Sequence, residues 1–176
     1  MKVFRVRSSD SQDLFNWRND EMSIAMSLNT NRISEDEHNT WFEAAIDSND
    51  KIIYVASEEG FDELVGMVRF ELEGSFNSQE NNKEKNYLFD PIFADISIIV
   101  NPNFRGRRLA TPLLLSAIKE FRRSYNIPIT AHIKEENKAS IKCFEKANFV
   151  LMDRYEKSFF YLMKMPITEY YPHEDF

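Results

Sequence analysis

The chain has 176 residues and a formal net charge of −7, with 43% hydrophobic and 29% charged residues. This size and composition predict one soluble, cytoplasmic globular domain over residues 1–165, followed by a polar tail over 166–176. The acidic balance argues against a nucleic-acid partner, and no apolar run is long enough for membrane insertion. The single cysteine excludes an internal disulfide and a multi-cysteine metal site, and no metal is expected.

The N-terminal half alternates short strands with helices. Val3 to Val6 alternates as a strand does, and Asp10 or Ser11 can cap a helix that continues through Trp17. Ser34 stands three residues before Glu37, a capping-box spacing that begins a second helix running to about residue 47. Two further strands are predicted over 51–57 and 64–72, joined by a turn over 58–62.

Residues 74–90 form a polar stretch without periodicity. A loop of this length between strands is usually a functional lid or a mobile excursion. A hairpin tip without a role is an equally good interpretation, and both alternatives stay open.

The C-terminal half predicts crossovers between parallel strands. A mostly apolar strand over 92–100 ends at Asn101-Pro102 and is followed by a long helix with apolar residues at helical spacing from Leu109 to Phe121. A strand over 127–133, a helix over 138–147, and strands over 149–152 and 157–165 complete the order. Two strand–helix–strand crossovers require parallel pairing. We therefore expect an α/β (α+β) domain, a mixed and mostly antiparallel sheet of about seven strands flanked by about four helices.

The segment over residues 100–110 carries the first chemical signal. A central strand ends there, the chain turns, and a helix begins, so free backbone N–H groups and the helix dipole point at one place. This geometry binds phosphates. Arg105, Arg107 and Arg108 add three cations to an acidic protein. A solvated run of charge is the alternative for this segment on its own.

A second segment, over residues 136–149, opens another helix with Asn137 as a plausible N-cap. Together the two segments resemble the signature motifs of the GNAT acetyltransferase superfamily, and the resemblance extends from residue 3 to about 165. The pyrophosphate loop of that family reads here as Arg105, Gly106, Arg107, Arg108, Leu109 and Ala110. The later helix reads as Asn137, Ala139, Ser140, Phe144, Glu145, Lys146 and Phe149.

The resemblance implies acetyl-CoA as co-substrate, with the backbone of the strand before the loop holding the pantetheine arm and Asn137 reaching it from the other side. The amine then attacks the thioester directly, so Cys143 is expected to pack rather than to react. The residues expected to bind the cofactor are Ile98, Ile99, Val100, Arg105, Gly106, Arg107, Arg108, Leu109, Ala110, Asn137, Ser140 and Phe144.

Two residues depart from the first motif. Arg108 stands where the family usually has Gly, which is unfavourable if the backbone there adopts a positive φ and costs little if it is already helical. Pro112 falls early in the helix and leaves the carbonyl of Arg108 without its intrahelical partner. Neither change removes the N–H groups of the loop.

The reaction needs a proton acceptor for the amine and a proton donor for the thiolate. Asp95 and Glu71 are the candidate bases, and Asp95 interrupts an apolar strand, where burial raises a carboxyl pKa. The alternative for Asp95 is a strand-end charge paired with an arginine. Many relatives have a Tyr donor at the position of Phe144, so Tyr155 and Tyr161 are the candidate donors. His38 and His132 are expected to be structural.

The acceptor side is predicted from residues 16–20, 37–38 and 41–43, which resemble two GNAT branches: enzymes that acetylate nucleotide-linked amino sugars, of the pseudaminic-acid pathway type, and enzymes that acetylate ribosomal-protein N-termini. Segments 96–98, 139–142 and 144–146 look closer to the sugar branch, so a nucleotide-linked amino sugar is the preferred acceptor, with a protein N-terminus or a small polyamine second. Trp17, Arg18 and Trp41 would line this side, or belong to the core.

A different class of function stays open, because a chain without the usual Tyr could bind acyl-CoA as a regulatory module without catalysis. Members of the family often dimerise, so a homodimer is compatible with the resemblance. No residue in the sequence identifies the surface that would form it.

Overall fold

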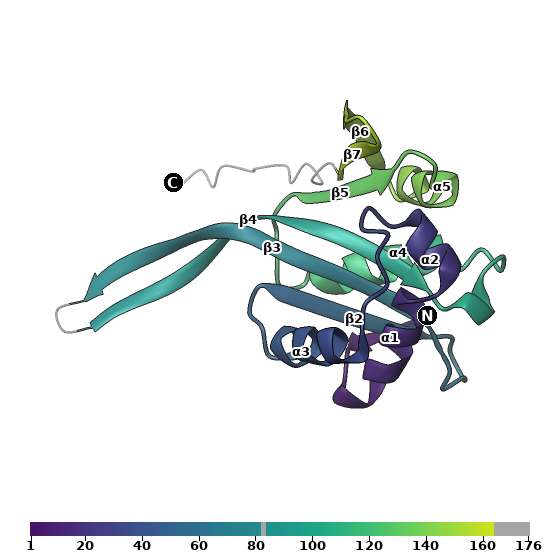
Figure 1. Ribbon diagram of the computed structural model, residues 1–176. Helices are drawn as coiled ribbons and strands as arrows, with labels where there is room; N and C mark the ends of the chain where they lie inside the picture. Colours follow the sequence, from purple (N-terminus) through teal and green to yellow (C-terminus); the bar gives the residue numbers. More distant parts are fainter. Residues whose placement is uncertain (82–83, 164–176) are drawn as a thin grey trace, which may run out of the picture.

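The computed structural model describes residues 1–81 and 84–163, and side chains outside 75–90 within them. Seven strands form one sheet in the order β1-β2-β3-β4-β5-β7-β6 (Figure 1). The strands are β1 (Lys2–Arg5), β2 (Lys51–Ser57), β3 (Leu64–Asn81), β4 (Glu84–Val100), β5 (Ile129–Lys134), β6 (Phe149–Arg154) and β7 (Ser158–Met163). The helices are α1 (Ser11–Arg18), α2 (Glu21–Met26), α3 (Glu35–Ile46), α4 (Ala110–Phe121) and α5 (Lys138–Lys146), with short 3-10 turns at Ser8–Asp10 and Pro102–Phe104.

The mixed, mostly antiparallel sheet is confirmed, but only one of the two crossovers joins strands that pair. β4 and β5 are parallel neighbours on either side of α4. β7 lies between β5 and β6 and is antiparallel to both, so the second crossover, through α5, does not place its two strands side by side. The prediction of two parallel pairs was wrong because β7, the last strand, lies between β5 and β6.

The parallel pair β4–β5 is very short. Ala94 lies opposite Ile129 and Asp95 lies opposite Thr130, and no further pair joins these two strands within the described chain. β4 stays paired with β3 as far as Val100, opposite Gly66. The sheet therefore splits after Asp95, and we call this place the β4–β5 split.

The two faces of the sheet pack against different helices, and the alternation of side chains along each strand divides them. Val68 and Phe70 of β3 belong to a core built with α4 and α5. Met67, between them on the other face, belongs to a second core built with α1 and α3. Arg69 and Glu71 share the face of Met67, so the α1–α3 side of the sheet becomes polar toward the split.

The β3–β4 hairpin extends well beyond the body of the domain (Figure 1). The pairing of β3 with β4 continues past Glu73, through a register shift, to Asn81 opposite Glu84. The prediction that ordered strand ends at residue 72 and resumes at 92 was therefore wrong. Backbone pairing between the two strands does not need apolar periodicity, and this polar ribbon has none. The tail 166–176 lies outside the described residues.

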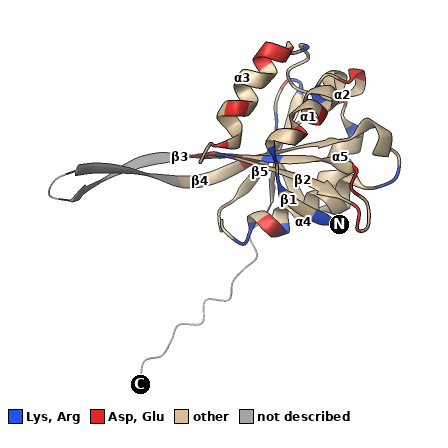
Figure 2. Ribbon diagram, turned by 90° about the horizontal axis from the view of Figure 1, so that it is seen from below, with Lys and Arg blue, Asp and Glu red and all other residues tan. Residues whose placement is uncertain are grey.

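Local helix signals were accurate where a cap was present. The Ser34 hydroxyl accepts from the Glu37 amide at 3.2 Å, and the Glu37 carboxylate accepts from the Ser34 amide at 2.7 Å, which confirms the capping box. Acidic residues gather along α3 (Figure 2), and three of them lie in its first turn, where the helix dipole favours them. Throughout residues 1–81 and 84–163, every helix falls short of the length or the apolar character that a membrane crossing needs.

The short helix α2 was not predicted. Asp20 caps it by accepting from the amide of Ser23 at 3.0 Å. The helix spans six residues, none of which is buried, so it carries no apolar stripe that periodicity could detect. The count of about four helices was low for this reason.

The core against α4 yields a stability prediction. Phe121 is fully buried and stacks on Phe70 with ring centroids 4.1 Å apart. Phe121→Ala should lower the free energy of unfolding by about 3–5 kcal/mol in urea titrations, because it removes the buried ring and leaves a cavity. Leu115→Ala, on an exposed part of the same helix, is the control and should stay within about 0.5 kcal/mol. Equal losses in the two variants would contradict this packing.

Candidate active site

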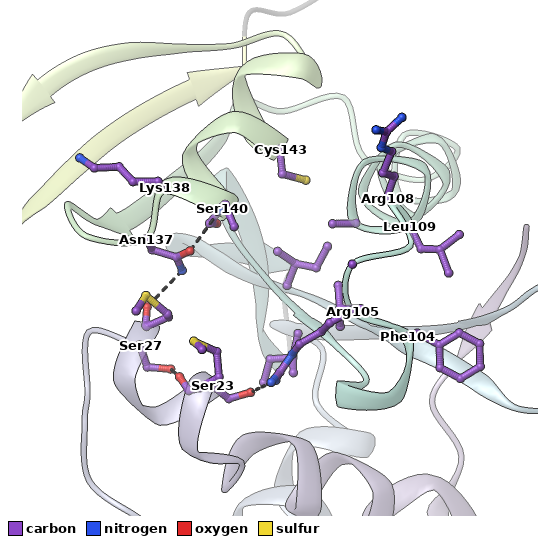
Figure 3. Close-up of a pocket in the computed structure, with 18 of the residues that line it drawn as sticks. Ser23, Ser27, Phe104, Arg105, Arg108, Leu109, Asn137, Lys138, Ser140 and Cys143 are labelled. Atoms are coloured by element: carbon purple, nitrogen blue, oxygen red, sulfur yellow. Dashed lines mark hydrogen bonds between the residues drawn. The ribbon is translucent and has the colours of Figure 1, made fainter.

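A cavity of about 630 Å³ lies between the split edge of β4, the start of α4 and the start of α5 (Figure 3). Its walls come from α2, from the end of β4 with the following loop, and from the β5–α5 connection. The lining residues are Met22, Ser23, Met26, Ser27, Ile98, Ile99, Val100, Phe104, Arg105, Gly106, Arg108, Leu109, Ala110, Glu136, Asn137, Lys138, Ala139, Ser140 and Cys143. The two segments that carry the sequence motifs are thus brought to one cavity.

The loop before α4 is fixed by Asn101, which is buried. Its amide nitrogen donates to the Leu64 carbonyl at 2.8 Å, and its side-chain oxygen accepts from the Asn103 amide at 3.0 Å. Beyond it, no backbone acceptor in the described chain bonds the N–H groups of Gly106 to Ala110. Free amides next to a helix N-terminus are suited to an anion.

Arg108 adopts φ +62°, and Gly106 adopts φ +77°. Of the two alternatives drawn from the sequence, the unfavourable one holds, because Arg108 occupies a left-handed conformation that Gly would adopt freely. Pro112 lies in the first turn of α4, where a missing N–H is tolerated. Arg107 is anchored over the ring of Phe104, with its guanidinium carbon 4.6 Å from the ring centroid.

Arg105 lines this cavity, but its side chain is committed to α2. Its guanidinium donates to the Asp20 carboxylate at 2.6 Å and to the Ser23 hydroxyl at 2.8 Å. Arg105 and Arg108 extend in different directions (Figure 3). The pKa of Asp20 is lowered, since its bonds with Ser23 and Arg105 together outweigh its burial, the largest single influence. The side chain of Arg105 thus joins the loop to α2.

The other end of α2 is joined to the opposite wall. Lys134 donates to the Ala25 carbonyl at 2.8 Å, and the Asn137 amide nitrogen donates to the Met26 carbonyl at 3.3 Å. Asn137 also caps α5 by accepting from the Ser140 amide at 3.1 Å, which confirms the predicted N-cap. Helix α2 therefore bridges the β4–β5 split from one side to the other.

The residues of this cavity fit acetyl-CoA. The free N–H groups of the loop suit a pyrophosphate. The edge of β4 from Ile98 to Val100 has no strand partner on the β5 side within the described chain, so its backbone can bond an extended arm. Asn137 and Ser140 line the opposite wall. We expect these residues to hold the cofactor, which supplies an activated acetyl group as a thioester.

A second cavity, of about 610 Å³, lies on the α1–α3 side of the sheet. Its lining residues are Leu14, Arg18, Met26, Ser27, Leu28, Asn29, Ile33, Glu37, His38, Trp41, Met67, Arg69, Asp95, Ile96, Ser97, Ile98, Ile99, His132, Ile133, Lys134, Asn137, Ser140 and Phe144. Six residues line both cavities: Met26, Ser27, Ile98, Ile99, Asn137 and Ser140. The two cavities therefore meet at the β4–β5 split.

Asp95 lies at the split and faces the second cavity. Its carboxylate accepts from the Thr130 hydroxyl at 3.1 Å and lies 3.2 Å from Nδ1 of His132. Burial raises the pKa of Asp95, and the charge of Glu71, directly opposite on β3, adds to that shift, while His132 and Thr130 oppose it. Asp95 is therefore paired with a histidine rather than with the arginine that the sequence suggested.

Glu71, the other candidate base, does not line either cavity. Its carboxylate lies 3.6 Å from Nε of Arg69. Arg18 and Trp41 do line the second cavity, as expected for the acceptor side. Trp17 does not. It is 5% exposed within the second core, because the inward face of α1 carries it under α3.

The candidate proton donors are placed away from the cavities. Tyr161 is 1% exposed in the first core, and its hydroxyl donates to Glu145 at 3.4 Å. Tyr155 is exposed, with its ring 6.3 Å from that of His132. Neither residue lines either cavity. Phe144 is buried at the wall of the second cavity.

Cys143 and His38 have local roles. The Cys143 thiol accepts a bond from Thr111 at 3.6 Å, and burial raises its pKa, so the thiol stays protonated. His38 packs against Phe15, Trp41 and Phe42, and its Nε2 lies 3.0 Å from the Ser11 carbonyl. Burial lowers the pKa of His38, which keeps it neutral. No group of three or more His, Cys, Asp or Glu in the described ranges is arranged to hold a metal ion.

The prediction from sequence missed Arg69, His132, Lys134 and the cavity residues of α2. The first three could have been found from alternation, since polar residues recur at every second position of β3 and β5 on the face that α1 and α3 cover. Helix α2 gave no such signal, because none of its six residues is buried and it carries no apolar stripe, although Met22, Ser23 and Met26 line the first cavity.

Residues 3–150 match the protein family described as Acetyltransferase (GNAT) domain. A comparison with curated protein sequences finds no significant match.

Solved structures with the same fold include a spermidine N-acetyltransferase from Vibrio cholerae in complex with CoA and spermine, at 18% identity and TM-score 0.74 over 92% of this chain and 93% of that chain. A ribosomal-protein-alanine N-acetyltransferase from Brucella melitensis matches at 20% identity and TM-score 0.69, over 94% and 100%. An aminoglycoside acetyltransferase in complex with coenzyme A and kanamycin matches at 16% identity and TM-score 0.71, over 93% and 94%.

The loop conformation yields a paired prediction. Arg108→Gly should be about 1 kcal/mol more stable than Arg108→Ala, because both lose the guanidinium and only Gly relieves the left-handed strain. At Arg107, where φ is not positive, the order should reverse, with the Gly variant less stable by about 0.5–1 kcal/mol. Urea titration of the four variants measures both differences. The same order at both positions would contradict the loop geometry.

Proposed function

Because this chain belongs to the GNAT acetyltransferase family, we propose that its acceptor is the primary amine of a nucleotide-linked amino sugar. The chain is an acetyl-CoA-dependent N-acetyltransferase, the activity of that family. In the transfer, the amine nitrogen forms a bond to the thioester carbonyl carbon, the carbon–sulfur bond breaks, and the amine loses a proton while the thiolate gains one. No nucleophile of the protein is needed, in keeping with the protonated Cys143.

One observation carries the proposal: the second cavity shares six lining residues with the first at the β4–β5 split. An acceptor in the second cavity would present its amine where the edge of β4 holds the activated acetyl group. The polar side chains on its floor and the aromatic wall of Trp41 suit a polar, ring-shaped molecule. The likeness of segments 96–98, 139–142 and 144–146 to the sugar branch supports a nucleotide-linked amino sugar over a protein N-terminus or a polyamine.

Asp95 is the proposed proton acceptor. Among the described residues, it is the one carboxylate that lines the second cavity at the split and is hydrogen-bonded to a histidine. Its raised pKa brings its proton affinity closer to the working range of a general base. His132 orients the carboxylate and connects it to the cavity, since the imidazole is 40% exposed.

The substrate assignment is tested by thiol release from acetyl-CoA with a panel of amines. UDP- and dTDP-linked amino sugars should give turnover, while an N-terminal alanine peptide and spermidine, acceptors suggested by the similar structures, should be poor substrates. Turnover with peptides or spermidine alone would overturn the amino-sugar proposal. Binding of CoA without turnover for any amine would favour the regulatory module instead.

The role of Asp95 predicts a specific change in the pH profile. A base must be ionised to accept a proton, so activity of the wild type should fall as the pH drops through the raised pKa of Asp95. Asp95→Asn should lower kcat by about 10²–10⁴-fold and remove this acidic limb. Asp13→Asn, in an exposed position on α1, is the matched control and should keep the wild-type profile.

The stability of the same variant separates a catalytic from a structural role. A carboxyl whose pKa is raised in the folded state destabilises the fold above that pKa, where it is ionised. Asp95→Asn should therefore unfold at the same temperature as the wild type, or a higher one, at neutral pH. A large loss of Tm, or an unchanged acidic limb, would contradict the proposed role.

A further inference from the structure

The protein as a whole is acidic, but the second cavity has more cationic than anionic side chains available to a ligand. Its cationic side chains are Arg18, Arg69 and Lys134, and its carboxylates are Glu37 and Asp95. The Glu37 carboxylate already accepts from the amide and the hydroxyl of Ser34, at 2.7 and 2.8 Å. Asp95 is bonded to Thr130 and His132.

Arg18 is held in the wall with one donor unused. Its NH2 group donates to the carbonyls of Asn29 and Asn31, at 3.0 and 3.3 Å, so the loop before α3 fixes the guanidinium in place. Its NH1 group is buried and has no hydrogen-bond partner among the described residues. A buried donor without an acceptor is costly, and in a cavity wall it is normally satisfied by a ligand or water.

Arg69 brings a second guanidinium to the same place. Burial, and then the charge of Arg69, lower the pKa of Arg18, so the two cations interact. Arg69 packs over the ring of Trp41, with its guanidinium carbon 5.7 Å from the centroid. Its ion pair among the described residues is loose, with Nε 3.6 Å from the Glu71 carboxylate. Its two terminal nitrogens have no hydrogen-bond partner in that part of the chain.

Lys134 does not complete this pair. Its ammonium donates to the Ala25 carbonyl and lies 3.6 Å from the Glu136 carboxylate, so its charge is used at the α2 side of the cavity. The positive charge that is available to a ligand is therefore concentrated at Arg18 and Arg69. The guanidinium groups of Arg18 and Arg69 line the same cavity and repel each other. An oxyanion bound by both would offset that repulsion and accept hydrogen bonds from their free N–H groups.

We propose that Arg18 and Arg69 form an oxyanion subsite that binds a phosphate or carboxylate group of the acceptor. The subsite deepens the proposed function, on which it rests, because it requires an acceptor that carries an anion as well as an amine. A diphosphate-linked amino sugar meets this requirement. A polyamine does not, since its additional charges are all positive.

The subsite is tested by calorimetry on the full chain saturated with CoA, so that the phosphate-binding loop is filled. UDP is the phosphate probe and glucuronate is the carboxylate probe. We expect UDP to bind, and Arg69→Gln to weaken that binding about tenfold or more, the scale of a charge-assisted hydrogen bond. Arg123→Gln, which removes an exposed arginine that follows α4 and lines neither cavity, is the matched control and should bind UDP as the wild type does.

The outcomes separate this proposal from the proposed function. Binding of glucuronate but not UDP, still dependent on Arg69, would support the subsite and assign it to a carboxylate. Binding of neither probe, or equal binding by the wild type and Arg69→Gln, would overturn it. The subsite can also be wrong while the proposed function is right. In that case UDP-linked amino sugars are still acetylated, and their KM is the same for Arg69→Gln as for the wild type.

Arg18→Gln is a weaker test by itself, because Arg18 also holds the loop before α3. Arg18→Lys keeps a positive charge at this position but loses the forked geometry of the guanidinium. It should weaken UDP binding, and thermal unfolding of the variant shows whether the fold is intact. A folded Arg18→Lys variant that binds UDP with wild-type affinity would contradict the part assigned to the buried NH1 group.

Discussion

The separation of β4 from β5 after a two-residue parallel pair is the constraint on which the rest of the site depends. A sheet that continued would satisfy the edge of β4 with another strand and would close both cavities. The separation is possible because β4 stays fixed on its other edge. Gly66 lies opposite Val100, and a Cβ on Gly66 would come within 2.4 Å of the Ile99 carbonyl oxygen, so β3 approaches β4 too closely for any larger residue.

The two sides of the β4–β5 split are joined by helix α2, which makes polar contacts with both. Arg105 binds its first turn from the α4 side, while Lys134 and Asn137 bind its last carbonyls from the β5–α5 side. None of these contacts depends on a buried apolar face. The contacts that hold α2 are therefore separate from the packed cores on the two faces of the sheet.

The sequence predicted the fold well where a physical signal was local. The capping box at Ser34, the N-cap at Asn137 and the apolar stripe of α4 each determined an element within a few residues. The order of β4, turn and α4 around residues 100–110 was also predicted, and phosphate binding by this loop stays a prediction. The insertion of β7 between β5 and β6 was not predictable in this way, because it depends on long-range pairing.

The candidate site was predicted less completely. Asp95 was recognised because a charge in an apolar strand is unusual, whereas its partner His132 was taken as structural, since the register that joins them was unknown. Trp17 and Trp41 are the same residue type on neighbouring helices, and only packing decides that one is core and the other lines a cavity. Arg105 matched a motif, but its side chain serves α2.

A crystal structure of the chain with CoA would test the role of the β4–β5 split most directly. We expect the pyrophosphate to accept from backbone N–H groups between Gly106 and Ala110, and the pantetheine arm to lie along the free edge of β4 at Ile98 to Val100. The sulfur should lie where the two cavities meet, near Ser140. A sulfur placed away from that junction, or an arm that does not follow β4, would show that the split does not bring the acetyl group to the acceptor cavity.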